Sequence, residues 1–251
     1  MDERVANTLI RINKEFYQTF SASFAHTRQR VQPGVSQVLD QIPREGNWLD
    51  LGCGNGSLAR EWVQQGRRGL YHGVDSSPQL LQIARQNFEN EKSHPGLEMI
   101  FSLLDLTSPQ WSSAFKEMIW DGVLAFAVLH HIPGQAIRSV LISRVRDLLS
   151  VGKPFWISVW QFQHSPRFRS RQIGWEAIHL SEKEVEPGDT LIDWRAETTG
   201  EQKKIGIRYV HFFKDDELNS LAQQNGFRVM NEFPSDGKGG NLSLYQLWQA
   251  I

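Results

Sequence analysis

The fold of this chain is decided by residues 48–56, WLDLGCGNG. Apolar residues lead to an acid, and glycines then stand at every second position. The segment that follows, 57–63, spaces its apolar residues as a helix does. The pattern therefore predicts a strand, a tight glycine loop and a helix. Glycines let the backbone approach a ligand closely, because a Cβ at those positions would block it. A tight turn without any ligand is the alternative.

The acid in this loop distinguishes between two classes of ligand. Dinucleotide-binding loops follow G-x-G-x-x-G and place a pyrophosphate at the helix N-terminus. Here Ser57 stands in place of the third glycine, and Asp50 would repel a pyrophosphate. An acid suits a ligand with a positive centre, such as S-adenosylmethionine, which carries an ammonium and a sulfonium. We expect Asp50, Gly52, Cys53 and Gly54 to bind that ligand.

A second predicted strand, 69–75, ends in another acid, Asp75. An acid about 20 residues past the loop accepts hydrogen bonds from ribose hydroxyls. Ser76, which follows it, is assigned to the same site. The alternative is that Asp75 favours the N-terminus of the next helix through the helix dipole, and both roles can hold at once.

Length and composition limit the class of protein. The 251 residues, 40% hydrophobic and 22% charged, suit one α/β domain with an elaboration. A net charge of -1 gives no overall basic surface for nucleic acid, although a local patch stays open. The single cysteine excludes an internal disulfide and argues against a thiolate zinc site, so no metal is predicted. Without a signal peptide or an apolar stretch of membrane-spanning length, the sequence predicts a cytoplasmic protein with no membrane contact. It gives no oligomeric state.

Strands and helices alternate as far as a fifth strand at 155–160, which predicts a parallel, doubly wound sheet. A strand at 227–233 and a last strand at 242–248 follow, the last expected to be antiparallel and inserted beside its neighbour. We expect a single domain over 1–251, with 1–45 as a helical cap. Segment 161–207 breaks the alternation and shows no clear structure. It is predicted to be a substrate-recognition insertion, mobile in the free protein.

The pattern of residues 48–56 resembles motif I of the class I S-adenosylmethionine-dependent methyltransferases, and the resemblance covers nearly the whole chain. It implies a Rossmann-like fold: a seven-stranded, mostly parallel sheet with helices on both faces and an antiparallel last strand. It also implies that the Asp105 carboxylate accepts from the adenine amino group and that the backbone of Leu106 contacts the adenine ring. Phe126, at the end of the fourth strand, is placed at the same site.

A narrower resemblance lies in four stretches: SFAHTR (23–28), AVLHH (127–131), VW (159–160) and RYVHFF (208–213). They look like the wobble-uridine tRNA carboxymethyl methyltransferases, which esterify a carboxymethyl group on the anticodon uridine. Those enzymes usually continue their N-terminal motif with a Pro-Trp-Pro-like stretch, whereas this chain keeps one proline and no tryptophan at 29–33.

Aromatic residues of the first predicted helix, 5–20, and of the stretch after it have two interpretations. Tyr17 and Phe24 either pack in the core or cover the methionine end of the cofactor. Arg28 could pair with a carboxylate, either on the cofactor or on the acceptor.

Methyl transfer is an in-line displacement, which is accelerated mainly by holding the nucleophile and the methyl group together. A carboxylate nucleophile needs no base, only a cation to orient it, and Arg208 is the first candidate for that cation. A hydroxyl or amine needs a base, for which His131, His130 and His211 are candidates. A structural role for each histidine is the alternative.

Three functions follow from these observations. The first is a methyltransferase for a small-molecule acceptor, through an oxygen, nitrogen or carbon nucleophile. The second is a tRNA methyltransferase that contacts RNA through Arg167, Arg169 and Arg171. The third is a non-catalytic module that binds S-adenosylmethionine.

Overall fold

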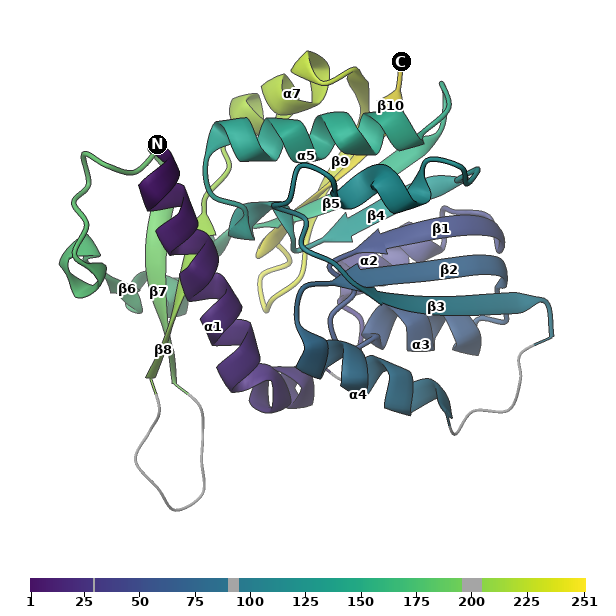
Figure 1. Ribbon diagram of the computed structural model, residues 1–251, viewed down its shortest axis with the longest axis horizontal. Coiled ribbons are helices and arrows are strands. Elements are labelled where there is room, and N and C mark those ends of the chain that lie inside the picture. Colours follow the sequence, from purple (N-terminus) through teal and green to yellow (C-terminus); the bar gives the residue numbers. More distant parts are fainter. Residues whose placement is uncertain (29, 90–94, 196–204) are drawn as a thin grey trace.

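A seven-stranded sheet with the order β3-β2-β1-β4-β5-β10-β9 forms the centre of the molecule (Figure 1). The structure is a computed structural model that describes residues 1–28, 30–89, 95–195 and 205–251. Neighbouring strands from β3 to β5 pair in parallel, and β10 is antiparallel to both β5 and β9. The strands are β1 (Glu45–Leu51), β2 (Arg68–Asp75), β3 (Leu97–Leu103), β4 (Gly122–Phe126), β5 (Pro154–Trp160), β9 (Phe227–Ser235) and β10 (Ser243–Ala250). The predicted fold, including the inserted antiparallel last strand, is confirmed.

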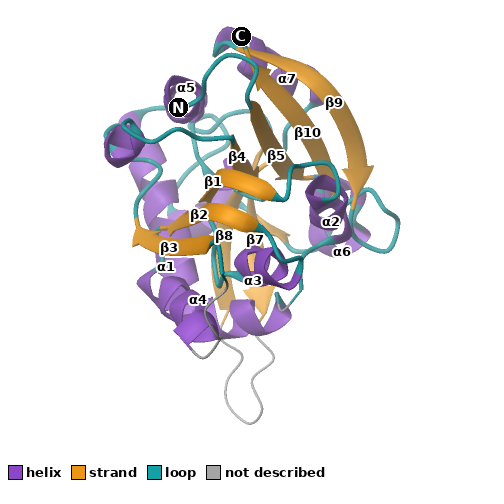
Figure 2. Ribbon diagram, turned by 90° about the vertical axis from the view of Figure 1, so that its right-hand side faces the viewer, coloured by secondary structure: helices purple, strands orange, loops and turns teal. Residues whose placement is uncertain are grey.

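Helices cover both faces of this sheet (Figures 1 and 2). One face carries α2 (Pro33–Leu39), α3 (Ser57–Gln64) and α4 (Pro78–Glu89), and the other carries α5 (Gln135–Leu148) and α7 (Asp215–Gln224). Alternate residues of a strand point to opposite faces, so Trp48 joins the core beneath α3 while Leu49 joins the core beneath α5. Both residues are completely or almost completely buried, which explains why β1 is apolar at successive positions.

A second, three-stranded antiparallel sheet lies beside the first, in the order β6-β7-β8 (Figure 1). It contains β6 (Gln172–Ile173), β7 (Asp189–Arg195) and β8 (Ile205–His211), and the short helix α6 (Pro166–Arg169) precedes it. The prediction that segment 161–207 lacks clear structure is therefore wrong for its described residues. Its strands were hidden because alternate residues of β7 pack in two different small clusters, Leu191 with α1 and Ile192 with Trp160.

Helix α1 (Glu3–Thr27) runs between the second sheet and α4 and is longer than predicted (Figure 1). Its N-terminus is capped by Asp2, whose carboxylate accepts from the backbone N–H of Val5 at 2.8 Å. Within the described residues, neither α1 nor any other helix combines the length and the apolar character needed to cross a membrane.

The pairing of β1 with β2 brings two glycines, Gly46 and Gly69, opposite each other. A Cβ on Gly69 would lie 2.3 Å from the carbonyl oxygen of Gly46, and the φ of Gly69 is +96°. Only glycine fits this crossing without moving the backbone.

We expect Gly69→Ala to lower the free energy of unfolding by roughly 2–5 kcal/mol, because it adds a backbone clash to an unfavourable φ. Gly66→Ala is the matched control, since Gly66 also has a positive φ, +64°, but a Cβ there meets nothing within 4 Å. The control should cost only about 1–2 kcal/mol. Urea denaturation of both variants measures the difference, and equal losses would contradict the clash.

Candidate active site

A cavity of about 290 Å³ opens at the carboxyl ends of the central strands, bordered by α1 and by β8. Ligands of open α/β sheets bind in this position. The cavity brings together the predicted site residues Tyr17, Arg28, Asp50, Gly52, Cys53, Gly54, Asp75, Ser76, Asp105, Leu106, Phe126, His131 and Arg208. His211 is not among its lining residues, and the side chain of Phe24 lies outside the described part of the structure.

The glycine loop is held by two backbone N–H groups, those of Gly52 and Cys53, which both donate to the carbonyl of Val74 at 2.8 and 3.0 Å. Gly52 and Gly54 have φ of +73° and +55°, a conformation that residues with a Cβ rarely adopt. A Cβ on Gly54 would meet nothing within 4 Å. The backbone of the loop is thus left bare toward the cavity.

Asp75 fixes this loop to the end of β2. Its Oδ2 accepts from the N–H of Gly54 at 2.9 Å, and its Oδ1 accepts from the N–H of Ser77 at 2.8 Å. Burial raises the pKa of Asp75, and the backbone hydrogen bonds oppose that rise. A carboxylate has about four acceptor positions, so Asp75 can still accept hydrogen bonds from a ligand.

Asp50 is a buried acid in the cavity wall, only 3% exposed. The hydroxyl of Tyr71 donates to its carboxylate. Burial raises the pKa of Asp50 to about 7; the bond from Tyr71 opposes this rise and nearby Asp75 adds to it. A positively charged ligand would relieve this buried negative charge. The buried carboxylate of Asp50 therefore fits a sulfonium or ammonium group of a ligand.

Asp105 is paired with Lys14 of α1, which was not among the predicted site residues. The ammonium of Lys14 lies 2.7 Å from Oδ2 of Asp105, and Thr107 donates to Oδ1 through its N–H and its hydroxyl. Burial acts to raise the pKa of Asp105, but these hydrogen bonds outweigh it and the pKa is lowered. Asp105 is therefore ionised, and α1 is tied across the cavity to the end of β3.

A chain of hydrogen bonds runs along the other side of the cavity. The Nδ1 of His131 lies 3.2 Å from the carbonyl of Tyr209, which can only accept, so this nitrogen carries the proton. The Nε2 of His131 then accepts from the hydroxyl of Tyr17 at 2.9 Å. Burial, with the charge of Arg208, lowers the pKa of His131 to about 3. His131 is neutral, and its lone pair is already occupied.

Arg208 is a buried cation, 3% exposed, surrounded by aromatic rings. Its guanidinium carbon lies 4.9, 5.0 and 5.4 Å from the ring centres of Phe16, Trp194 and Trp160. It bonds to Tyr17, while its Nε has no hydrogen-bond partner among the described residues. No ion pair within the described ranges offsets its charge, and burial lowers its pKa.

The remaining histidine candidates do not offer a free base. Nδ1 of His130 accepts from the N–H of Trp160 at 3.2 Å, and burial lowers the pKa of His130 well below its usual value. His211 lies outside the cavity because it points to the opposite face of β8 from Arg208, between Asp189 and Glu217. The prediction of His211 as a base is not supported by this placement.

Sequence reasoning also missed residues that only the tertiary structure brings to the cavity. Asn13 of α1 donates to the carbonyls of His131 and Tyr209, at 3.1 Å each, and accepts from the N–H of Tyr209. Asp236, in the loop between β9 and β10, accepts from the hydroxyl of Tyr245 at 2.8 Å. The spacing of Ile10, Asn13, Lys14 and Tyr17 along one face of α1 was the available signal.

Comparisons with known proteins agree with this geometry. Residues 49–152 match the family model described as a methyltransferase domain. The CcbJ methyltransferase of Streptomyces caelestis superposes with a TM-score of 0.69 at 14% identity, covering 96% of this chain and 99% of that one. A S-adenosylmethionine-bound amino pentose methyltransferase of Micromonospora echinaspora, CalS10, gives 0.60 at 15% identity, covering 94% and 98%.

The chain is a class I S-adenosylmethionine-dependent methyltransferase. The predicted family, fold and cofactor are confirmed, and so is the prediction of an S-adenosylmethionine-dependent methyltransferase. S-adenosylmethionine, when bound, supplies the electrophilic methyl group.

Among sequence relatives, this methyltransferase is 25% identical to the tRNA (carboxymethyluridine(34)-5-O)-methyltransferase of Schizosaccharomyces pombe, over 86% of this chain and 88% of that protein. It is 26% identical to the enzyme of the same name from Arabidopsis thaliana, over 57% of this chain and 31% of that one. The chain thus spans most of the yeast relative but about a third of the plant relative.

Asp50→Asn should stabilise the cofactor-free methyltransferase at high pH. The folded protein holds the Asp50 proton more tightly than the unfolded chain does, with a pKa of about 7 instead of 3.8. The contribution of this proton to stability is complete at pH values below the unfolded pKa and is lost as the pH rises through 7. The advantage of the variant should therefore grow by roughly 2–3 kcal/mol between pH 5 and pH 8.

Urea denaturation at the two pH values measures this change. Asp147→Asn is the control, because Asp147 is an exposed acid on α5. Its substitution should change the free energy of unfolding by the same amount at pH 5 and at pH 8. A pH-independent difference for Asp50→Asn would show that Asp50 ionises normally.

Proposed function

We propose that this methyltransferase transfers the methyl group of S-adenosylmethionine to a carboxylate oxygen of a small-molecule acceptor, with Arg208 holding that carboxylate. The observation that carries the proposal is the buried guanidinium of Arg208, which lines the cavity without an acidic partner in the described residues. Removing an unpaired charge from water is unfavourable, so an anionic ligand is the natural counterpart. Arginine also matches a carboxylate with two parallel hydrogen bonds.

The state of the histidines supports a nucleophile that needs no base. With a pKa of about 3 and its Nε2 bonded to Tyr17, His131 is a poor proton acceptor. Burial, opposed by Arg208, raises the pKa of Tyr17, which therefore stays a neutral donor. A carboxylate arrives ionised at neutral pH, so the chain has only to orient it and exclude water.

For the cofactor end we propose that Asp75 accepts from the ribose hydroxyls, that Asp105 and Leu106 contact the adenine, and that Asp50 lies near the positive groups. Tyr17 then lies where α1 separates the cofactor from the acceptor. The fit of a cation to the buried Asp50 and the bare loop at Gly54 support this orientation.

We also propose that 1–45 acts as a cap and that 161–207 recognises the acceptor, within one domain. Helix α1, in the first segment, brings Tyr17 and Lys14 to the cavity. Trp194, in the second segment, packs on the guanidinium of Arg208. Arg208 is the first residue after that segment.

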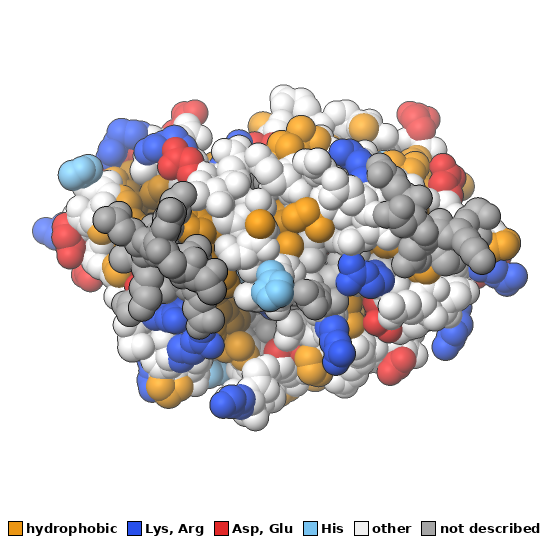
Figure 3. All heavy atoms as spheres, turned by 90° about the horizontal axis from the view of Figure 1, so that it is seen from below, with side chains coloured by type: hydrophobic (Ala, Val, Ile, Leu, Met, Phe, Trp, Pro, Cys, Tyr) orange, Lys and Arg blue, Asp and Glu red, His pale blue; other side chains and the backbone are white. Residues whose placement is uncertain are grey.

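The carboxymethyl group of a tRNA wobble uridine is the second candidate acceptor, since it would present the same carboxylate to Arg208. It is favoured by the names of the fission-yeast and plant relatives and by the exposed Arg167 and Arg169 of α6. The face seen in Figure 3 shows Lys and Arg side chains at several separate places, with acidic side chains between some of them. Steep salt dependence of tRNA binding would favour this acceptor.

The chemical nature of the product tests the proposal. We would incubate the enzyme and methyl-labelled S-adenosylmethionine with a pool of small carboxylic acids, and separately with total tRNA. A carboxyl methyl ester releases its label as volatile methanol in mild alkali, whereas N-methyl and C-methyl products keep it. Label that resists alkali in both arms would overturn the proposal.

Arg208→Met should raise the KM of the acceptor about 10- to 100-fold, the loss expected for a charge-assisted hydrogen bond. The Kd of S-adenosylmethionine, measured by titration calorimetry, should change less than about twofold, because the proposed cofactor contacts lie elsewhere in the cavity. Arg169→Met, on the exposed surface of α6, is the matched control and should leave a small acceptor's KM unchanged. Equal KM values for both variants would rule out Arg208 as the carboxylate's partner.

His131→Gln separates a carboxylate from a hydroxyl or amine nucleophile. If no base is used, kcat should fall less than about tenfold, because only orientation is disturbed. A general base would contribute about 100- to 10,000-fold, and its loss would give a drop of that size. Single-turnover rates of wild type and variant at pH 7 decide between the two.

A further inference from the structure

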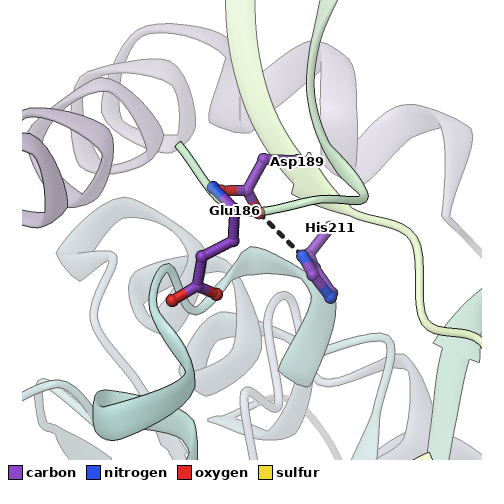
Figure 4. A group of neighbouring side chains, drawn as sticks. All are labelled: Glu186, Asp189 and His211. Atoms are coloured by element: carbon purple, nitrogen blue, oxygen red, sulfur yellow. Dashed lines mark hydrogen bonds and ion pairs between the residues drawn. The ribbon is translucent and has the colours of Figure 1, made fainter. Parts of the chain in front are cut away.

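A cluster of charged side chains lies outside the cavity lining and is not used by the reaction proposed above. Its members are Arg138, Glu186, Asp189, His211 and Glu217, called here the His211 cluster. Figure 4 shows Glu186, Asp189 and His211 as neighbours, with Asp189 bonded to the imidazole. Arg138 comes from α5, Glu186 from the segment before β7, Asp189 from the start of β7, His211 from β8 and Glu217 from α7. His211 and Arg138 are each 1% exposed, whereas the side chains of Glu186 and Glu217 are 19% and 34% exposed, so the cationic centre of the cluster is buried and two of its acids reach the surface.

His211 is held between two carboxylates. Its Nδ1 lies 2.7 Å from Oδ1 of Asp189, and its Nε2 lies 2.8 Å from Oε1 of Glu217. A carboxylate only accepts, and a neutral imidazole carries one N–H, so two such bonds require the imidazolium. Burial acts to lower the pKa of His211, but the two carboxylates outweigh burial and raise it.

The donor atoms of Glu186, Asp189 and His211 lie within 4.8 Å of one another, a spacing that could hold a metal ion. Both ring nitrogens are already bonded, however, and the guanidinium of Arg138 lies 2.7 Å from Glu186 and 3.5 Å from Glu217. A second cation beside Arg138 would be repelled. The imidazolium and Arg138 therefore act as counter-charges of these acids, together with the N-terminal ammonium of Met1, which lies 3.8 Å from Oε1 of Glu186.

The cluster is connected to two backbone segments of the active site. Asp189 also accepts from the hydroxyl of Tyr209 at 2.7 Å. It therefore holds both Tyr209 and His211, which lie on the same face of β8, the strand that carries Arg208. Arg138 donates to the carbonyl of Ile132 at 3.2 Å, next to His131. Its partner Glu186 accepts from the first N–H of α5, that of Gln135, at 2.9 Å.

We propose that the His211 cluster is a positioning element of the acceptor site, which holds Arg208 and His131 in place while His211 carries its proton. Its role toward the acceptor rests on the proposed function, whereas its effect on Arg208 does not. The charged or titratable groups facing His211 are those of the cluster itself, Tyr209 on its own strand, and His130 in the loop after β4.

The direction of the pH dependence follows from linkage. The folded protein binds the His211 proton more tightly than the unfolded chain, whose histidine pKa is about 6.5. The stabilisation is complete below that value and is lost as the pH rises through the higher folded pKa. Each unit of difference between the two pKa values corresponds to tenfold in the equilibrium for local opening. Strand β8 and the loop at 129–132 should therefore open more at alkaline pH.

Nuclear magnetic resonance of the full chain, labelled with ¹³C and ¹⁵N, tests the proposal without an acceptor. The Cε1 signal of His211 reports its own titration, and the Nε signal of Arg208 reports the position of the guanidinium. We expect the Arg208 signal to shift with pH at the midpoint of His211 and to lose that transition in His211→Gln. His164→Gln, an exposed histidine outside the cavity lining, is the matched control and should retain it. A pH-independent Arg208 signal in the wild type would overturn the proposal.

Glu217→Gln is the second variant, should His211→Gln fail to fold. It keeps the bond to Asp189 and removes one charge, so the midpoints of His211 and Arg208 must fall together. Hydrogen exchange of 205–211, corrected for its intrinsic pH dependence, should rise by the factor that the His211 pKa predicts. Metal in the purified protein, removed by EDTA with a change in the His211 signal, would instead make the cluster a metal site. If these results hold but Arg208→Met leaves the acceptor's KM unchanged, only the proposed function fails.

Discussion

Charge burial around one cavity is the constraint on which the rest of this structure depends. Asp50 has only the hydroxyl of Tyr71 as a described partner, and Arg208 has only Tyr17 and aromatic rings. Taking such groups out of water costs several kcal/mol each, after relaxation. A fold that keeps them there must recover the cost from packing elsewhere, and two apolar cores on the two faces of the main sheet provide that packing.

Helix α1 forms one wall of the cavity at the edge of the main sheet. Its apolar stripe packs on the second sheet through Val5 and Leu9, while its other side carries Lys14 to Asp105. Asn13, which is buried on the same helix, forms hydrogen bonds with backbone groups of β8 and of the loop after β4. One helix therefore links the Asp105 side of the cavity to the His131 side, and a shift of α1 would change both sides.

Strand β8 serves two sites because its residues alternate. Arg208 and Val210 face Trp160. Tyr209 and His211 face the other way, Tyr209 toward Val5 and Leu9 in the first turns of α1 and His211 toward the His211 cluster. A neutral, bonded His131 on one side and a charged, bonded His211 on the other make neither histidine a free base. The chemistry that this arrangement suits is the placement of an anion that already carries its nucleophilic electrons.

The sequence by itself determined the sheet, the glycine loop and the acids at the strand ends. These features depend on local patterns, namely glycine at positive φ, apolar runs in buried strands and acids at fixed distances from the loop. Only the tertiary structure decided which side chains meet across elements. Lys14 contacts Asp105, 91 residues away in the chain, and Asp189 contacts His211 across the pairing of β7 with β8. A periodic pattern can show which face of a helix or strand is used, but it does not name the partner on another element. A histidine's charge is likewise set by neighbours that the local sequence does not name.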